Sequence, residues 1–158
     1  MREYRKLNEK TAELYLTFLK KALEADPGEM MTDCFDEEAI RQRLLDPFYQ
    51  NTASILAVED GEAVGRIEYH FYGCLQDGYR MAYVDWVYVL PEHRHKGVAQ
   101  GLFTAFEKEC AVFEIDQYYL IRAEGENADS FYAAFPDTER TSEPILRKYF
   151  RKDQIHEA

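Results

Sequence analysis

A basic turn between an extended segment and an amphipathic segment is the part of the sequence best suited to chemistry. It comprises His93, Arg94, His95 and Lys96, and so places two of the four histidines beside two fixed cations. Gly97 follows, and a glycine lets the backbone approach a ligand without a Cβ in the way. Where a strand turns into a helix, unpaired backbone N–H groups and the positive end of the helix dipole bind phosphates. The turn therefore predicts a phosphate site.

The charge balance limits the partners that this chain can have. Lysine and arginine number 19 and aspartate and glutamate number 30, so the formal net charge is −11. A nucleic-acid partner is therefore not expected, because such a chain repels phosphates over most of its surface. Charges more than a Debye length of ~8 Å away are largely screened, so a local basic turn can still bind an anion.

Length and residue usage predict one folded domain in the cytoplasm. The 158 residues fit a single domain, and 46% apolar residues exclude the disordered and low-complexity classes. No apolar run approaches the roughly 20 residues of a membrane helix, and the first residues lack the apolar core of a signal peptide. We therefore expect no membrane partner. The three cysteines form no C-x-x-C pair, which disfavours a disulfide framework or a zinc ribbon.

Apolar periodicity predicts the elements that position the turn. Spacings of three and four residues predict a helix over 12–23, capped by Asn8, and a second from Asp36 to Leu45. Alternating and β-branched residues predict strands, and Asp-Gly pairs predict the turns of an antiparallel meander. The meander strands span 55–58, 64–72 and 80–90. A helix over 98–113, a parallel strand over 118–121, a helix over 127–135 and a strand over 145–150 follow.

The basic turn contains the short pattern R-x-x-G-x-A. Arg94, Gly97 and Ala99 form it, five residues beyond Val89. The P-loop pattern G-x-x-x-x-G-K-[ST] and the dinucleotide pattern G-x-G-x-x-G do not occur. In its context of strand, proline, basic turn and amphipathic helix, the segment resembles motif A of the GNAT superfamily, the GCN5-related N-acetyltransferases.

The resemblance implies a fold and a co-substrate. The fold would be α/β, with a mixed, mostly antiparallel central sheet flanked by helices, splayed parallel central strands and one acetyltransferase domain over residues 1–158. The co-substrate would be acetyl-CoA, with no metal; the H-x-H pair in the turn is expected to face solvent. The expected contacts to the pantetheine arm are Val87, Tyr88 and Val89. The expected contacts to the pyrophosphate are Arg94, His95, Lys96, Gly97, Val98, Ala99 and Gln100.

A second family pattern, N-x-x-A-x-x-x-Y, is partly present after the strand over 118–121. Ala128 and Tyr132 match it, whereas Gly125 stands in the asparagine position. Asn127 lies two residues further on and is expected to supply the contact to the cofactor. The resemblance thus adds Asn127 and Tyr132 to the residues expected to bind acetyl-CoA.

The implied reaction is direct attack of a primary amine of a small molecule or peptide on the thioester. It needs a base for the ammonium, a donor for the oxyanion and an acid for the departing thiolate. Tyr132 is the expected acid, and Asp85 is the expected base, with Glu68 and His70 on the neighbouring strand as rivals. A backbone N–H at a strand bulge near 87–89 is the expected oxyanion donor. Period two places Asp85 on the face of Val87 and Val89 unless the bulge intervenes.

The sequence says less about the amine acceptor and about the oligomeric state. The acidic run Asp33, Asp36, Glu37 and Glu38 would favour a cationic amine if it borders the acceptor entrance. Relatives pair through strands or their last elements, so the resemblance also allows a homodimer. The departure at Gly125 leaves a second function open, an acyl-CoA sensor or scaffold without turnover. A structural domain with an accidental basic turn is a third alternative.

Overall fold

The computed structural model describes residues 1–30 and 32–150. These residues fall into two compact units, one from Met1 to Leu120 and one that begins at Ile121. None of the helices in the described part is long and apolar enough to cross a lipid bilayer. The expectation of one domain over residues 1–158 stays a prediction, and residues 151–158 lie outside the described part.

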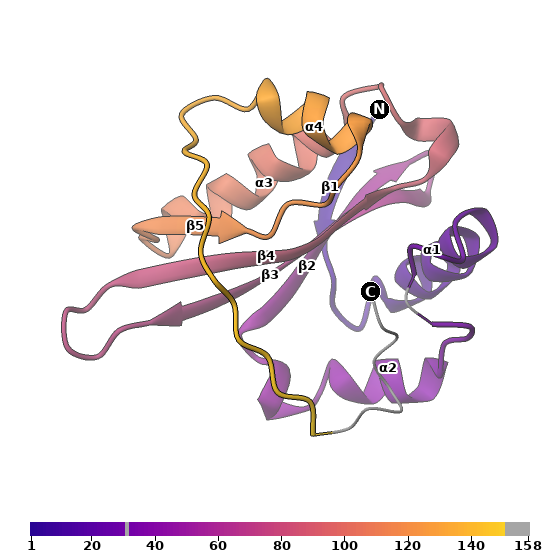
Figure 1. Cartoon of the computed structure of the whole chain (residues 1–158). Helices are drawn as coiled ribbons and strands as arrows, with labels where there is room; N and C mark the ends of the chain where they lie inside the picture. The colour runs from indigo at the N-terminus through magenta and orange to yellow at the C-terminus, as the bar shows by residue number, and fades with distance from the viewer. Residues whose placement is uncertain (31, 151–158) are drawn as a thin grey trace. The chain divides into compact units, whose positions relative to one another are not determined.

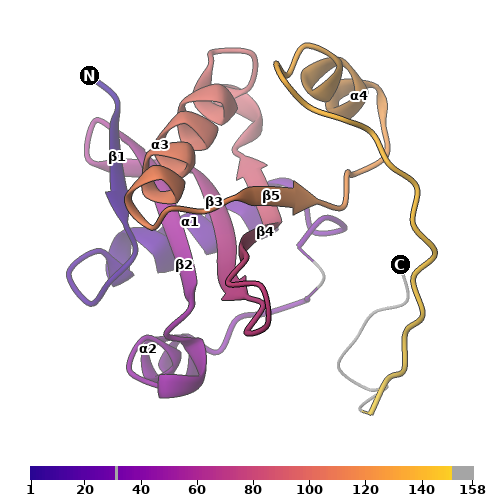
Figure 2. The ribbon, with the colours of Figure 1, turned by 90° about the vertical axis from the view of Figure 1, so that its left-hand side faces the viewer.

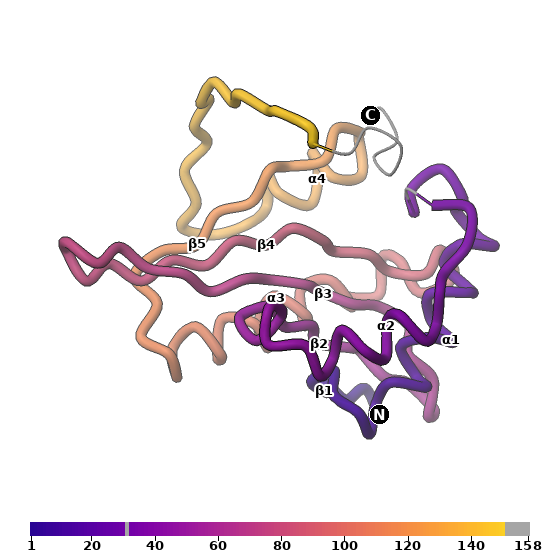
Figure 3. The backbone as a smooth tube through the Cα atoms, turned by 90° about the horizontal axis from the view of Figure 1, so that it is seen from below, coloured from indigo at the N-terminus to yellow at the C-terminus, as the bar shows by residue number. Residues whose placement is uncertain are grey.

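The first unit is built on a five-stranded sheet in the order β1-β2-β3-β4-β5 (Figure 1). Its strands are β1 (Glu3–Lys6), β2 (Thr52–Glu59), β3 (Glu62–Gly73), β4 (Arg80–Val89) and β5 (Gln117–Leu120). The first three pairings are antiparallel and β4 pairs with β5 in parallel, which confirms the mixed, mostly antiparallel sheet. The predicted meander is β2, β3 and β4; β3 and β4 form its longest hairpin, which Figure 3 shows from below.

Helices flank the sheet on both faces. In the first unit, which contains the sheet, these helices are α1 (Ala12–Ala25), α2 (Glu37–Arg43) and α3 (Val98–Val112); the second unit contains the helix α4 (Glu126–Ala133). Figures 1 and 2 show α1 and α3 on opposite faces of the sheet. Short 3-10 turns at Pro47–Tyr49 and Pro91–His93 follow α2 and β4 respectively.

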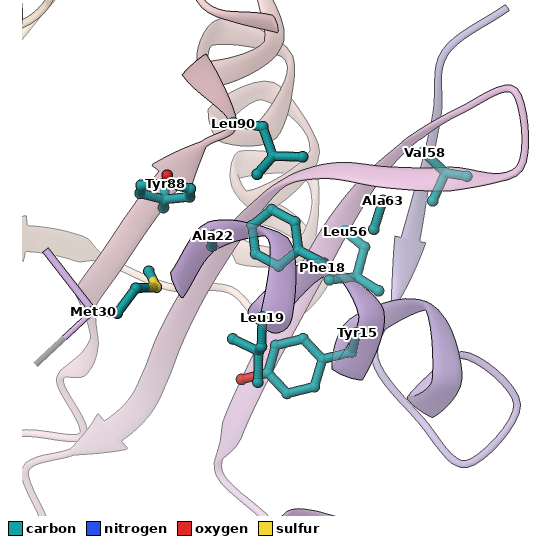
Figure 4. Close-up of a cluster of buried hydrophobic side chains, with 10 residues drawn as sticks. All are labelled: Tyr15, Phe18, Leu19, Ala22, Met30, Leu56, Val58, Ala63, Tyr88 and Leu90. Atoms are coloured by element: carbon teal, nitrogen blue, oxygen red, sulfur yellow. The ribbon is translucent and has the colours of Figure 1, made fainter. Parts of the chain in front are cut away.

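Each of the two long helices buries one apolar stripe. From α1, Tyr15, Phe18, Leu19 and Ala22 pack onto the sheet in the cluster of Figure 4. The other members of that cluster are Met30, Leu56, Val58, Ala63, Tyr88 and Leu90. The stripe of α3 is Val98, Leu102, Phe103, Phe106 and Cys110. Burial raises the pKa of the Cys110 thiol to about 12, as suits a core residue and not a nucleophile.

Three local predictions differ from the structure. The N-cap of α1 is Thr11, while Asn8 lies in the preceding turn, where its carbonyl accepts from the Thr11 N–H. Strand β1 was not predicted, because all four of its residues are exposed and carry no alternating pattern. The strand expected over 145–150 is wrong, since these residues form no strand in the structure. An apolar run with β propensity becomes a strand only where another strand edge pairs with it.

Candidate active site

The pairing of β4 with β5 ends halfway along β4. Met81–Val84 pair with Gln117–Leu120, and no described strand continues beside β4 beyond that point. Residues 85–89 therefore present one backbone edge without a strand partner. Unpaired backbone groups of this kind can pair with an extended ligand.

The turn after β4 adds a cluster of free N–H donors. His95 and Gly97 have left-handed backbones, with φ of 59° and 76°, and Gly97 is the N-cap of α3. Within the described residues, nothing accepts from the backbone N–H of His95, Lys96 or Gly97. The first N–H groups of α3 have no partner inside the helix either. Such a turn at a helix N-terminus forms a concave anion site, and residues 95–100 are called the cradle below.

The side chain of Arg94, just before the cradle, forms hydrogen bonds with two other elements of the first unit. Its Nε donates to the Val89 carbonyl at 2.9 Å, and its Nη2 donates to Asp26 Oδ2 at 2.6 Å. The Tyr88 hydroxyl donates to the same Asp26 oxygen at 2.7 Å. The hydrogen bond from Tyr88, and then that from Arg94, hold the pKa of Asp26 below its ordinary value. Arg94 therefore joins the end of β4 to the C-terminal end of α1, so its cation is fixed in place and not mobile.

A second set of hydrogen bonds comes from the N-terminus, and sequence reasoning missed it. Arg2 Nη2 donates to the Lys96 carbonyl at 3.0 Å, and Arg2 Nε donates to Glu59 Oε1 at 2.6 Å. The other oxygen of Glu59 lies 3.0 Å from His93 Nδ1. Three residues far apart in the sequence thus hold the turn, and only the pairing of β1 with β2 brings Arg2 there. His95 and Lys96 themselves are exposed.

A bulge in β4 decides where Asp85 points. Glu68 pairs with Trp86 and Tyr69 with Val84, so Asp85 is the extra residue of β4. The bulge therefore lies at Asp85 and not near 87–89 as the sequence indicated. It breaks the period of two, so that Asp85 and Trp86 line the same cleft, whereas Val87 is not among the described lining residues.

The Asp85 carboxylate lies in a cluster of titratable side chains with Glu68 and His70. His70 Nε2 lies 2.8 Å from Asp85 Oδ2, and His70 Nδ1 lies 3.0 Å from the Thr52 hydroxyl. Burial, followed by repulsion from Asp85, raises the pKa of Glu68. The Ser54 hydroxyl donates to Glu68 Oε1 at 3.4 Å.

The same three residues are also the described group best spaced for a metal ion. One ligand atom from each of Glu68, His70 and Asp85 falls within 4.8 Å of the others. Both nitrogens of His70 are already in hydrogen bonds, however. A metal ion that bound through His70 would therefore have to replace one of these hydrogen bonds.

Glu68, His70 and Asp85 line a cleft of about 900 Å³ in the first unit. Its walls come from α1 and the segment before it, from the α2 region and from β2, β3 and β4. None of the acidic residues of the run 33–38 is among the described lining residues, although Phe35 within that run is. Asp36 instead caps α2, and Glu37 pairs with Lys20 and Arg41. The carboxylates that do line the cleft are those of Glu9, Glu68 and Asp85.

Comparison with known proteins decides what this arrangement is. The family model described as Acetyltransferase (GNAT) family matches residues 11–135, most of the chain. The chain belongs to the GNAT acetyltransferase family. It is therefore an acyltransferase, and members of the family take acetyl-CoA as donor. No curated protein sequence gives a significant match.

Solved structures show the same fold as this GNAT protein. Ribosomal-protein-alanine N-acetyltransferase from Brucella melitensis biovar Abortus 2308 is 19% identical, with a TM-score of 0.73 over 94% of this chain and 100% of that one. An aminoglycoside acetyltransferase from an uncultured soil metagenomic sample, in complex with trehalose, is 13% identical, with a TM-score of 0.76 over 94% and 96%. An aminoglycoside N-acetyltransferase in complex with CoA is 23% identical, with a TM-score of 0.64 over 94% and 96%.

The second unit of the GNAT protein holds the remaining predicted residues. Asn127 and Tyr132 both lie on α4, with Gly125 at its N-cap. Arg122 binds Asp129 and so links the start of the unit to the helix. The Tyr132 ring contacts Phe131 and Phe135, and burial raises the pKa of its hydroxyl. The contacts of Asn127 and Tyr132 with acetyl-CoA stay predictions.

Proposed function

We propose that this GNAT protein transfers the acetyl group of acetyl-CoA to a primary amine of a small molecule or peptide by direct attack. The observation that carries the proposal is the cradle, whose free N–H groups follow the one stretch of β4 without a strand beside it. A pyrophosphate in the cradle would lead the pantetheine arm along residues 87–89. Val87, Tyr88 and Val89 would contact that arm, and residues 94–100 would form the anion site around Gly97.

The side chains of Glu68, Asp85 and His70 supply the base in this proposal. An amine attacks only when it is unprotonated, so the cleft must accept a proton from an ammonium. Glu68 suits this role because its raised pKa makes it a stronger base than an ordinary carboxylate. Asp85 and His70 would take the proton onward toward the surface or act in place of Glu68. The two carboxylates also attract a cationic acceptor.

The unpaired backbone edge supplies the oxyanion donor. Peptide N–H groups of residues 85–89 that do not face β3 are free to donate within the described part of the sheet. Donors that are held in place by a strand stabilise a developing charge without reorganising. The bulge at Asp85 changes the direction in which these N–H groups point, close to the carboxylates of Asp85 and Glu68.

Tyr132 is the proposed acid, and replacing it with phenylalanine tests that role. We expect Tyr132→Phe to lower kcat by about 10²-fold, the lower end for general acids, because a thiolate leaves without much help. Because burial raises the pKa of Tyr132, its phenol stays protonated at pH values at which an ordinary tyrosine begins to ionise. Steady-state kinetics, with melting temperature as the folding control, measure the effect. An unchanged kcat would assign Tyr132 to packing.

The decisive experiment combines binding and turnover. Acetyl-CoA at one hundred times its Kd should stabilise the native protein by about 2.7 kcal/mol, seen as a raised Tm. A thiol-release assay with a panel of amines should then detect CoA. A raised Tm without thiol release from any amine would instead support the acyl-CoA sensor. No change in Tm would indicate a structural domain.

A further inference from the structure

Arg66 is a buried cation that lines the cleft without a direct ion pair among the described residues. It is 7% exposed and lies on β3, where it lines the cleft two residues before Glu68. Within the described residues, no carboxylate oxygen comes within 4.0 Å of its guanidinium. Its Nη1 donates to the Tyr15 hydroxyl, and its Nε has no hydrogen-bond partner in the described part. Glu68 is close enough for its attraction to Arg66 to oppose the rise in the Glu68 pKa, but it makes no direct ion pair with Arg66 among the described residues.

Aromatic rings account for only part of the surroundings of Arg66. Its guanidinium carbon lies 5.3 Å from the Tyr15 ring centre and 5.6 Å from that of Trp86. Contacts with ring faces attract the cation but accept no hydrogen bond from Nε. The indole N–H of Trp86 is buried beside it and also has no partner among the described residues. Arg66 and Trp86, which both line the cleft, thus each have one buried N–H donor without an acceptor among the described residues.

The charges of the cleft are arranged in two groups. Glu68 and Asp85 form the negative group, and Arg66 lies next to it on the same face of β3, about 7 Å along the strand. Arg43 of the α2 region also lines the cleft and makes no ion pair among the described residues. Lys6 and Glu9 line the cleft as well, but Lys6 binds Glu109. The unpaired positive charge thus belongs to Arg66 and Arg43.

We propose that the acceptor is zwitterionic, an amino acid or a similar small amine that also carries a carboxylate, and that Arg66 binds this carboxylate. The proposal rests on the function proposed above, because it places the reacting amine at Glu68 and Asp85. The ammonium would face the negative group while the carboxylate accepts from the free Nε of Arg66. A polyamine or aminoglycoside has no such anion and would leave the buried cation unpaired.

Matched acceptors test the proposal on the unaltered protein. Each pair consists of an amino acid and the amine that lacks its carboxylate: lysine with cadaverine, phenylalanine with phenethylamine, and methionine with 3-methylthiopropylamine. We expect kcat/KM to be at least tenfold higher for the amino acid in one or more pairs. Equal or faster turnover of the decarboxylated amine in every pair would overturn the zwitterion and leave the transferase standing. If acetyl-CoA binds but no compound of either kind reacts, both proposals fail.

Substitution of Arg66 tests the assigned residue. Arg66→Met keeps an unbranched side chain but removes the cation, so the preference for the amino acid should fall to near one. Arg41→Gln is the matched control, because Arg41 pairs with Glu13 and Glu37 and does not line the described cleft. The Arg41→Gln variant should keep both its activity and its preference for the amino acid over the amine. A preference that survives in folded Arg66→Met would refute the role of Arg66.

Product inhibition keeps the proposal testable if the Arg66 variant does not fold. For the unaltered protein, the N-acetylated amino acid should inhibit at least tenfold more strongly than the N-acetylated amine without the carboxylate. The comparison measures binding at the same cleft without any substitution. Inhibition constants that do not differ would contradict an anion site at Arg66.

Discussion

Valine in place of Gly97 is expected to abolish measurable binding of acetyl-CoA. Gly97 has a φ of 76° and begins α3, so its backbone lies among the free N–H groups of the cradle. A Cβ at this position would meet no protein atom closer than Arg2 Nη1 at 3.9 Å. The added atoms therefore clash with no other part of the protein but would occupy the space of the approaching phosphates. A β-branched residue is also strained at positive φ and would turn the donors away.

Calorimetric titration with acetyl-CoA measures this effect, and Gly78→Val is its control. Gly78 has a φ of 67° and, like Gly97, has open space around its Cβ position, but it lies in the β3–β4 hairpin at the other end of β4. The two valines thus impose similar backbone strain, and only one touches the cradle. We expect Gly78→Val to bind acetyl-CoA normally. Normal affinity in folded Gly97→Val would refute the cradle as the phosphate site.

Glutamine in place of Glu68 is expected to lower kcat by about 10²–10⁴-fold, the range for loss of a general base. Glutamine has nearly the same shape but cannot accept the ammonium proton. In the unaltered protein, kcat/KM should rise with pH through the raised pKa of Glu68, because the base acts only when deprotonated. That rise should disappear from the pH profile of the variant.

Two other variants locate the base. Glu62→Gln is the control, since Glu62 is exposed, pairs with Lys21 and does not line the described cleft; its rate should not change. Asp85→Asn keeps Glu68 but removes the neighbouring negative charge, so the pKa of Glu68 should fall and the rise in kcat/KM should shift to lower pH. A larger loss of kcat in Asp85→Asn than in Glu68→Gln would make Asp85 the base.

Elements whose patterns are local could be predicted from the sequence. The stripes of α1 and α3 show the period of a helix, and the Asp60–Gly61 turn joins two strands through two left-handed residues. The R-x-x-G-x-A pattern depends on a glycine in a tight turn, and Gly97 has the positive φ that this requires. Each of these features depends on residues close together in the chain, so the sequence predicted them and, with them, the family.

Which side chains share the cleft depends on contacts between distant parts of the chain. The bulge at Asp85 arises from the pairing of β3 with β4, and a shift of one residue moves a side chain to the other face. Arg66 differs from an exposed arginine only because Tyr15 and Trp86 cover it, and Arg2 reaches the cradle only because β1 pairs with β2. Such contacts join residues that are distant in the chain. Local periodicity predicts buried apolar stripes but not strand register or the burial of a charged side chain, and these two properties decide which charged side chains line the cleft.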